Sequence, residues 1–237
     1  FQAEDGIRDR DVTEFRRVLF RSGADALELN IYDVVSSPQR SAMSVETELR
    51  DLILELKRAV RIPIAVKLSP FYTALGNLAK RLDDAGADGL VLFNRFYQPD
   101  VDLATQQVVL RLVFSTAQEL PLRLQWTALL HGRITASLAV AGGVWSADDG
   151  IKALLAGADA VQIVSALLRK GPSVFATVRQ GLEQFMEARG FPRVEGIKGM
   201  ASLAWSEDPA AFQRASYIRT LHGWKQDRVD MPLEATA

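Results

Sequence analysis

The sequence predicts an α/β fold in which helices cover a parallel sheet, as in a (β/α)8 barrel. The first observation is a threefold repeat of Gly-Ala-Asp followed by an apolar run, at GADALELN from residue 23, GADGLVLFN from 86 and GADAVQIVS from 157. The second is helically spaced apolar residues before the second and third copies, each series ending on glycine. The copies start 86 − 23 = 63 and 157 − 86 = 71 residues apart, about two βα units each. A doubly wound open sheet gives similar spacing and is the alternative.

The individual elements follow from short apolar runs and from helical periodicity. The runs are apolar on both alternations, which is typical of parallel strands covered on both faces. We expect parallel strands near residues 25–31, 63–68, 89–93, 136–141 and 160–164, neighbours in space in the order of the sequence. Helices are expected between them, near 44–60, 74–85, 121–132 and 147–156.

Residues 95–120 interrupt this alternation. The stretch from Val108 to Val113 alternates apolar residues and predicts an extra hairpin or loop strand. Long insertions after a barrel strand commonly shape the active-site face, although a surface excursion explains the pattern equally well.

Composition excludes several classes of function. The chain has 237 residues, 48% of them hydrophobic, and a formal charge of 28 − 29 = −1, so no basic field favours nucleic acid or an anionic membrane. It has no cysteine and two histidines, which argues against a metal site. No apolar run approaches the roughly 18–20 residues of a membrane helix. We therefore expect a cytoplasmic protein with a small-molecule substrate, and a homodimer is one assembly that this interpretation allows.

Polar residues share one face of several predicted strands. Alternation places Lys67 on the face opposite Val66 and Leu68, and Glu28 and Asn30 on the face opposite Leu29. Burying an unpaired polar group costs roughly 2–7 kcal/mol, so Lys67 must be paired or hold a ligand. One hypothesis is a structural pair between Glu28 and Lys67. The preferred hypothesis is a polar ligand at the carboxyl ends of the strands, contacted by Asn30, Lys67 and Asn94.

The last two predicted strands carry a phosphate-binding pattern. Gly142 and Gly143 follow one strand, and Ser146 with Asp149 predicts a capping box for the next helix. Val164 and Ser165 follow the last strand and open a short helix, after which Pro172 starts a longer one. Glycine lets backbone N–H groups approach an oxyanion, and (β/α)8 barrels commonly bind phosphate between their last two βα loops.

The motifs ALELNIY, PIAVKLSPF, GADGLVLFNRF and AVAGGVWSADDGIKALLAGADAVQIVSALLRKGP resemble the dihydroorotate dehydrogenases, most closely the dihydroorotate dehydrogenase-like (class 1-like) proteins. The resemblance covers residues 23 to about 225. It implies a (β/α)8 TIM barrel, FMN as cofactor, an oxidoreductase acting on a CH–CH group and a place in pyrimidine biosynthesis. It also implies that Lys67 approaches the N1/O2 edge of the flavin, that Asn30 lies near the ring, and that Asn30 and Asn94 bind substrate. Gly142, Gly143, Val164 and Ser165 would bind the FMN phosphate.

Two departures from the family pattern qualify these expectations. A Ser-Cys-Pro-Asn type stretch supplies the base in class 1 enzymes, whereas this chain has Asp33 at that position, so Asp33 is the candidate base and the substrate need not be dihydroorotate. The family also has three strands before the first one recognised here. Residues 1–22 resemble translated sequencing adapter rather than those strands. We therefore expect a non-native leader over 1–22 and a partial barrel domain over 23–237, with about the last five βα units and the insertion near 95–120.

Two other functions are consistent with the same residues. A flavin-free phosphate-binding barrel, a lyase or isomerase, would use the same glycines and Ser165, with Lys67 as a Schiff-base lysine. An inactive fragment is the third hypothesis, because part of the barrel is missing.

Overall fold

The computed structural model describes residues 23–95, 99–110, 113–204 and 208–223. The chain divides into two compact units, residues 1–204 and 205–237, and helix α8 (Pro209–Gly223) is the described part of the second. The predicted leader over residues 1–22 lies outside the described residues. The predicted single domain over 23–237 stays a prediction.

A five-stranded parallel sheet forms the centre of the first unit. Its strands lie in the order β1-β2-β3-β6-β7, which is their order in the sequence. Their bounds are β1 (Leu27–Asn30), β2 (Ile64–Leu68), β3 (Gly89–Leu92), β6 (Ser137–Ala141) and β7 (Ala160–Gln162). All five predicted parallel strands are confirmed, although each is one or more residues shorter than predicted.

The sheet is strongly curved. β1 and β7 are its two outermost strands, yet the Gln162 Nε2 on β7 donates a hydrogen bond to Glu28 Oε2 on β1. In a flat sheet these strands would be about 19 Å apart, four times the spacing between neighbours. Their side chains can meet only because the sheet curves, like the wall of a barrel, and brings β1 and β7 toward each other across its concave face. This curvature favours the barrel over the open doubly wound sheet.

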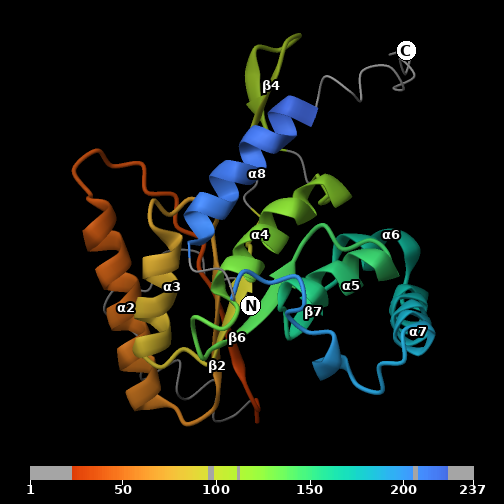
Figure 1. The fold of residues 1–237 in the computed structure, drawn as a ribbon. Coiled ribbons are helices and arrows are strands. Elements are labelled where there is room, and N and C mark those ends of the chain that lie inside the picture. The colour runs from red at the N-terminus through yellow and green to blue at the C-terminus, as the bar shows by residue number, and fades with distance from the viewer. Residues whose placement is uncertain (1–22, 96–98, 111–112, 205–207, 224–237) are drawn as a thin grey trace. The chain divides into compact units, whose positions relative to one another are not determined.

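Helices cover the convex face of the sheet and follow one another along it (Figure 1). α2 contacts α3, α3 contacts α4, α4 contacts α5 and α5 contacts α7. The bounds are α2 (Ala42–Ala59), α3 (Leu75–Asp84), α4 (Leu120–Leu130), α5 (Ala147–Ala156), α6 (Ser165–Lys170) and α7 (Ser173–Ala188). The predicted helices are confirmed, and the predicted capping box of Ser146 and Asp149 starts α5.

The core lies between the helices and the sheet, in two clusters of buried apolar residues. One cluster includes Ile53, Leu78 and Val66, from α2, α3 and β2. The other includes Val140, Ala153 and other residues of the half formed by β6, β7 and α4 to α7. On β2, Ile64, Val66 and Leu68 belong to the first cluster and have 0% exposure. Lys67 therefore points to the opposite, concave face, as the alternation predicts.

The Gly-Ala-Asp repeat has a structural basis in its glycine and aspartate. Gly86 and Gly157 adopt φ values of +95° and +114° after α3 and α5, a backbone conformation that suits glycine. Asp88 accepts a hydrogen bond of 2.7 Å from the Ile64 backbone N–H, and Asp159 one of 2.8 Å from that of Leu138. Each aspartate thus binds the first residues of the preceding strand and fixes the register between the two.

A lysine from elsewhere in the chain pairs with each of these aspartates. Lys57 donates to Asp88 and Lys198 to Asp159, both at 2.7 Å. Burial alone would raise the pKa of each carboxyl group. The hydrogen bonds from the lysine and the strand amide, with the charge of the lysine, outweigh burial and lower the pKa below its usual value. The folded state therefore favours the ionised aspartates.

We expect the free energy of unfolding to fall in acid because of these two groups. A carboxyl group with a lowered folded pKa stabilises the fold fully above its unfolded pKa of about 3.9, and this stabilisation is lost as the pH falls through the folded value. Asp88→Asn and Asp159→Asn should each cost about 1–2 kcal/mol at neutral pH. Urea unfolding between pH 7 and 3 should show a shallower acid decline in the double variant, whereas Asp51→Asn on the exposed face of α2 should behave like wild type. A decline equally steep in the double variant would contradict the assignment.

The insertion after β3 contains a separate antiparallel hairpin, β4 (Asp100–Asp102) with β5 (Gln107–Val109). This confirms the predicted hairpin, although β5 is shorter than the alternating stretch and residues 111–112 lie outside the described residues. A short 3-10 helix, η1 (Ala117–Glu119), then leads into α4. A second, η2 (Val194–Gly196), follows α7.

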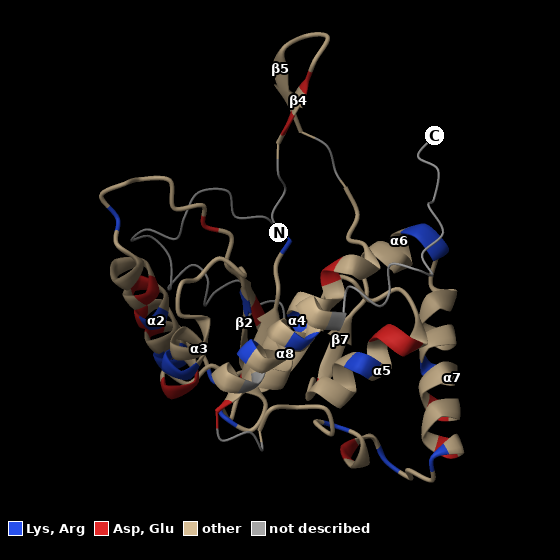
Figure 2. Ribbon diagram, turned by 45° about the horizontal axis from the view of Figure 1, so that its top comes forward, with Lys and Arg blue, Asp and Glu red and all other residues tan. Residues whose placement is uncertain are grey.

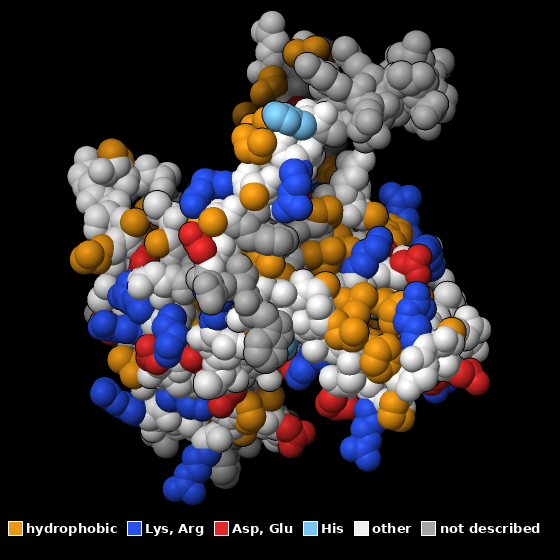
Figure 3. Space-filling model, in the orientation of Figure 1, with side chains coloured by type: hydrophobic (Ala, Val, Ile, Leu, Met, Phe, Trp, Pro, Cys, Tyr) orange, Lys and Arg blue, Asp and Glu red, His pale blue; other side chains and the backbone are white. Residues whose placement is uncertain are grey.

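The surface of the described residues carries charges of both signs. Helices α2, α3, α5 and α7 each carry both basic and acidic residues (Figure 2), in keeping with the small net charge of −1. Apolar side chains gather over α5, α6 and α7 on the face seen in Figure 3. Among the described helices, none has both the length and the apolar character that crossing a membrane requires.

Candidate functional site

A ring of three polar side chains lies on the concave face of the sheet. Lys67 Nζ donates to Gln162 Oε1 at 2.8 Å and forms an ion pair with Glu28 Oε1 at 3.3 Å. Gln162 Nε2 donates to the other carboxylate oxygen of Glu28. The Lys67 side chain is 17% exposed, so its ammonium group is largely withdrawn from water and held by these partners. The predicted Glu28–Lys67 pair is therefore present, and it includes Gln162 as well.

The two predicted asparagines meet at the carboxyl ends of β1 and β3. Asn94 Nδ2 donates to Asn30 Oδ1 at 2.5 Å and to the Ile31 carbonyl at 3.2 Å. Asn94 is buried, and its backbone N–H donates to the Leu68 carbonyl at the end of β2. Asn30 pairs in register with Lys67 on the neighbouring strand. The structure thus brings Asn30, Asn94 and Lys67 to the same end of adjacent strands, as the sequence predicts.

Asp33 lies in the loop between β1 and α2. Its carboxylate is 50% exposed and accepts a hydrogen bond of 3.3 Å from Arg40. The nearby Tyr72 phenol has its pKa raised to about 12, first by burial and then by the charges of Asp33 and Glu46. Tyr72 therefore stays protonated at neutral pH and donates rather than accepts a proton, whereas the Asp33 carboxylate has the chemistry of a base. Its role as the base stays a prediction.

Gly142 and Gly143 form a turn directly after β6, with φ values of +85° and +81°. A Cβ atom on Gly143 would lie 2.7 Å from the backbone nitrogen of Leu120, and one on Gly142 would lie 3.1 Å from the Arg123 guanidinium. Arg123 in turn donates to the Ala141 carbonyl at 2.6 Å and the Glu119 carbonyl at 2.7 Å. The glycines are therefore required for packing against the start of α4 as well as for any approach of a ligand.

Ser165 and Ser115 lie next to this turn. Ser165 begins α6, directly after Val164, which is 59% exposed. The Ser165 hydroxyl accepts from the Ser115 backbone N–H at 3.0 Å, and the two hydroxyl groups are 2.9 Å apart. The Ser115 hydroxyl also accepts from the Gly143 N–H at 3.3 Å. A backbone amide and two hydroxyl groups thus converge where β6 and β7 end.

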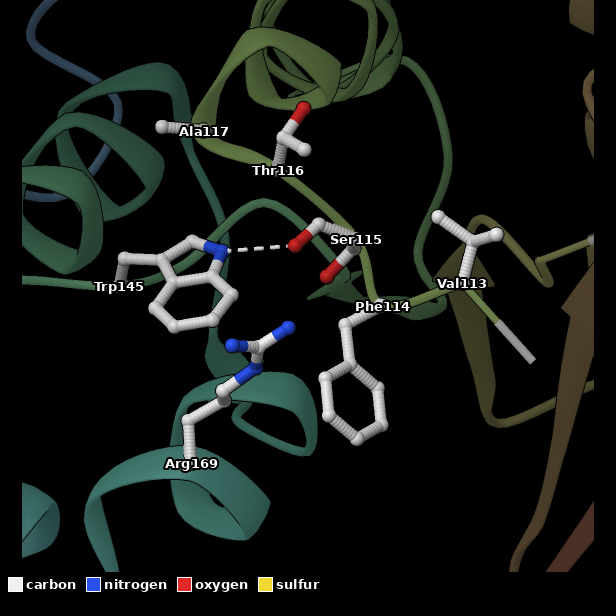
Figure 4. A pocket seen from close by; sticks show the side chains of 7 residues that line it. All are labelled: Val113, Phe114, Ser115, Thr116, Ala117, Trp145 and Arg169. Atoms are coloured by element: carbon white, nitrogen blue, oxygen red, sulfur yellow. Dashed lines mark hydrogen bonds between the residues drawn. The ribbon is translucent and has the colours of Figure 1, made fainter.

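A pocket of about 540 Å³ opens beside these serines (Figure 4). It is lined by residues 113–117, Trp145 and Arg169. The Trp145 indole donates to the Ser115 carbonyl at 3.0 Å, which fixes the wall of the pocket. The Arg169 guanidinium projects between the Trp145 and Phe114 rings, 5.1 Å from the centre of the latter. A positive group therefore lies within the pocket next to the cluster of hydrogen-bond donors.

Sequence reasoning missed Ser115, Gln162 and Arg169 as site residues. The signal for Ser115 was available, because Thr116 and Glu119 form a capping box that marks the start of the helical segment after the insertion. The residue before such a start lies at the end of a βα loop, where barrel sites are built. Arg169 gives no such signal, because a basic residue in the last turn of a helix is ordinary.

Comparison with known proteins finds a matching family model and several relatives. The family model described as dihydroorotate dehydrogenase matches residues 5–186, a range that begins within the predicted leader. The chain is 32% identical over 188 residues to the dihydroorotate dehydrogenase B (NAD(+)), catalytic subunit, of Methanothermobacter thermautotrophicus, covering 75% of this chain and 61% of the relative. Proteins of the same name from Methanocaldococcus jannaschii and Endomicrobium trichonymphae are 28% and 29% identical. These matches cover 82% of this chain, and 65% and 64% of the two relatives. The chain thus spans less than two thirds of the length of these relatives. The family match over most of the chain shows that it belongs to the dihydroorotate dehydrogenase family.

Proposed function

We propose that this chain forms the greater part of the FMN site of an oxidoreductase that acts on a CH–CH group. The observation that carries the proposal is the position of Lys67. Its ammonium group lies on the concave face of the sheet, next to the carboxyl end of β2, and Gly143 and Ser165 follow the carboxyl ends of β6 and β7. Lys67 would supply a cation for the flavin ring, and the Gly143 amide with the two serine hydroxyl groups would supply hydrogen-bond donors for the phosphate.

The residues at the ends of β6 and β7 suit a phosphate group. Phosphate oxygens are strong acceptors, and the cluster offers the Gly143 amide and two serine hydroxyl groups. At present Ser115 and Ser165 satisfy each other, so a phosphate would replace these hydrogen bonds with stronger, charge-assisted ones. Arg169 in the adjacent pocket supplies positive charge. Val164, exposed beside Ser165, would offer its backbone.

Each remaining site residue has a distinct role in this proposal. When bound, FMN supplies the two-electron acceptor. Lys67 would hold a positive charge beside the flavin ring, and Asn30 and Asn94 would orient the substrate through their amides. Asp33 would take up the substrate proton, because it places a carboxylate on the loop that follows Asn30.

The substrate is proposed only as a class. The family name points to dihydroorotate and so to pyrimidine biosynthesis, and the relatives named above carry NAD(+) in their names. The cytoplasm is the location that we propose. Asp33 stands where class 1 enzymes carry their base stretch, so we propose a small molecule with an oxidisable CH–CH bond, which need not be dihydroorotate itself. The flavin-free lyase or isomerase is not favoured by any contact described above.

Cofactor loading tests the proposal directly. The full-length gene product, purified and incubated with FMN and then passed through a desalting column, should keep the flavin absorption bands. Riboflavin, which lacks the phosphate, should be lost on the same column. A protein that keeps neither compound, or keeps both equally, would contradict the proposed site.

Ser165→Ala should weaken FMN binding without abolishing it. Loss of one charge-assisted hydrogen bond costs about 1.5–3 kcal/mol, which corresponds to an increase in the FMN dissociation constant of roughly tenfold to a hundredfold. Fluorescence titration would measure it. Ser44→Ala on α2 is the matched control and should bind FMN as wild type does. An unchanged constant in Ser165→Ala would remove Ser165 from the site.

A further inference from the structure

The three-residue ring around Lys67 joins strands that are distant in the sequence. Glu28 on β1 and Gln162 on β7 are 134 positions apart, and both contact the ammonium group of Lys67 on β2. Among the residues that the structure describes, Glu28 and Gln162 engage two of the three donors of this ammonium group, which leaves the third for a ligand. The ring therefore fixes the direction in which Lys67 can donate.

The chemistry of the ring also fixes the orientation of the Gln162 amide. Its oxygen must face the ammonium group of Lys67 and its nitrogen must face the carboxylate of Glu28, because the reverse would oppose donor to donor and acceptor to acceptor. Gln162 thus links the carboxylate of Glu28 to the ammonium group of Lys67 by hydrogen bonds and adds no charge. Glu28 adds a negative charge 3.3 Å from the ammonium nitrogen.

We propose that Glu28 and Gln162 are positioning residues that set how strongly the charge of Lys67 acts on the flavin. This inference rests on the proposed FMN site. Gln162 holds the ammonium group in place, and Glu28 offsets part of its charge. Because reduction adds negative charge to the flavin, the net charge of the ring decides how much more tightly the reduced form binds than the oxidised form.

Three variants separate this role from a purely structural one. Glu28→Gln removes the offsetting charge, so the preference for reduced over oxidised FMN should rise, on the order of tenfold for one charge at this range. Gln162→Glu adds a negative charge to a side chain of nearly the same shape, so the preference for reduced FMN should fall. The double variant Glu28→Gln with Gln162→Glu exchanges acid and amide, keeps every donor and acceptor of the ring paired, and should return the preference to the wild-type value.

The experiment titrates the full-length gene product and its variants with oxidised FMN and, anaerobically, with reduced FMN. Thermal unfolding of the flavin-free proteins, measured in parallel, reports the structural cost of each change separately. Opposite shifts in the single variants and restoration in the double variant are expected. Binding of FMN with the same preference in all four proteins, or shifts of the same sign in both single variants, would overturn the inference and leave the proposed function standing. Failure of the wild-type protein to bind FMN would overturn both.

Discussion

Lys67→Met is expected to lower the reduction potential of the bound flavin by about 40–50 mV. Two unit charges about 4 Å apart interact by about 4 kcal/mol near a protein surface, which corresponds to about 90 mV for a two-electron couple. Glu28 pairs with Lys67, so about half of this effect should reach the flavin. Oxidised FMN should still bind through Gly143 and Ser165, and reduction by substrate should become slower. Potentiometric titration followed by absorbance measures the shift.

The control for this experiment is Lys67→Arg, which keeps the charge and should keep most of the potential. The Schiff-base alternative predicts a different result, because borohydride would then trap substrate covalently on Lys67 in the absence of flavin. If Lys67→Met leaves both the potential and the rate of reduction unchanged, Lys67 is a structural partner of Glu28 and Gln162. The proposed flavin contact would then be wrong.

Gly143→Ala should impair both the fold and FMN retention. A side chain at a φ of +81° costs about 1–2 kcal/mol, and the overlap with the Leu120 backbone adds about 1–3 kcal/mol. For a chain of this size we expect the melting temperature to fall by roughly 5–15 °C. FMN should be lost, because the Gly143 amide moves away from Ser115.

Gly190→Ala separates the two costs. Gly190 has a φ of +72°, but a Cβ atom there would meet nothing within 4 Å, so only the cost of the backbone conformation applies. Differential scanning calorimetry should show a fall of a few degrees in Gly190→Ala and a larger one in Gly143→Ala. Equal falls would mean that the start of α4 shifts to accommodate the new methyl group.

Local patterns in the sequence were sufficient to predict the strands, the helices and the face on which Lys67 lies. The Ser146 and Asp149 capping box is an example, because its hydrogen bonds join residues three positions apart. Alternation along five residues of β2 likewise decides which side chains face the helices. Such features depend on neighbours in the chain, so the sequence carries them directly.

Contacts that depend on closure of the curved sheet could not be predicted in the same way. The hydrogen bond between Gln162 and Glu28 requires a curvature that periodicity does not encode. Ser115 and Ser165 are fifty positions apart in the sequence, so their contact requires the end of the insertion to lie beside the end of β7. The close approach of Gly143 to Leu120 depends on where α4 starts. The sequence therefore suggested a phosphate-binding role for the glycine turn but not its packing role.

The amino-terminal and carboxyl ends of the strands hold different groups of residues. Asp88 and Asp159 bind the amino-terminal parts of β2 and β6, whereas Lys67, Gly143 and Ser165 lie toward the carboxyl ends. A strand of five residues is about 16 Å long, and substitutions more than about 10 Å apart usually have additive effects on stability. Engineering of substrate preference at the carboxyl rim and of acid tolerance at the amino rim can therefore proceed independently, and the gains should combine in one protein.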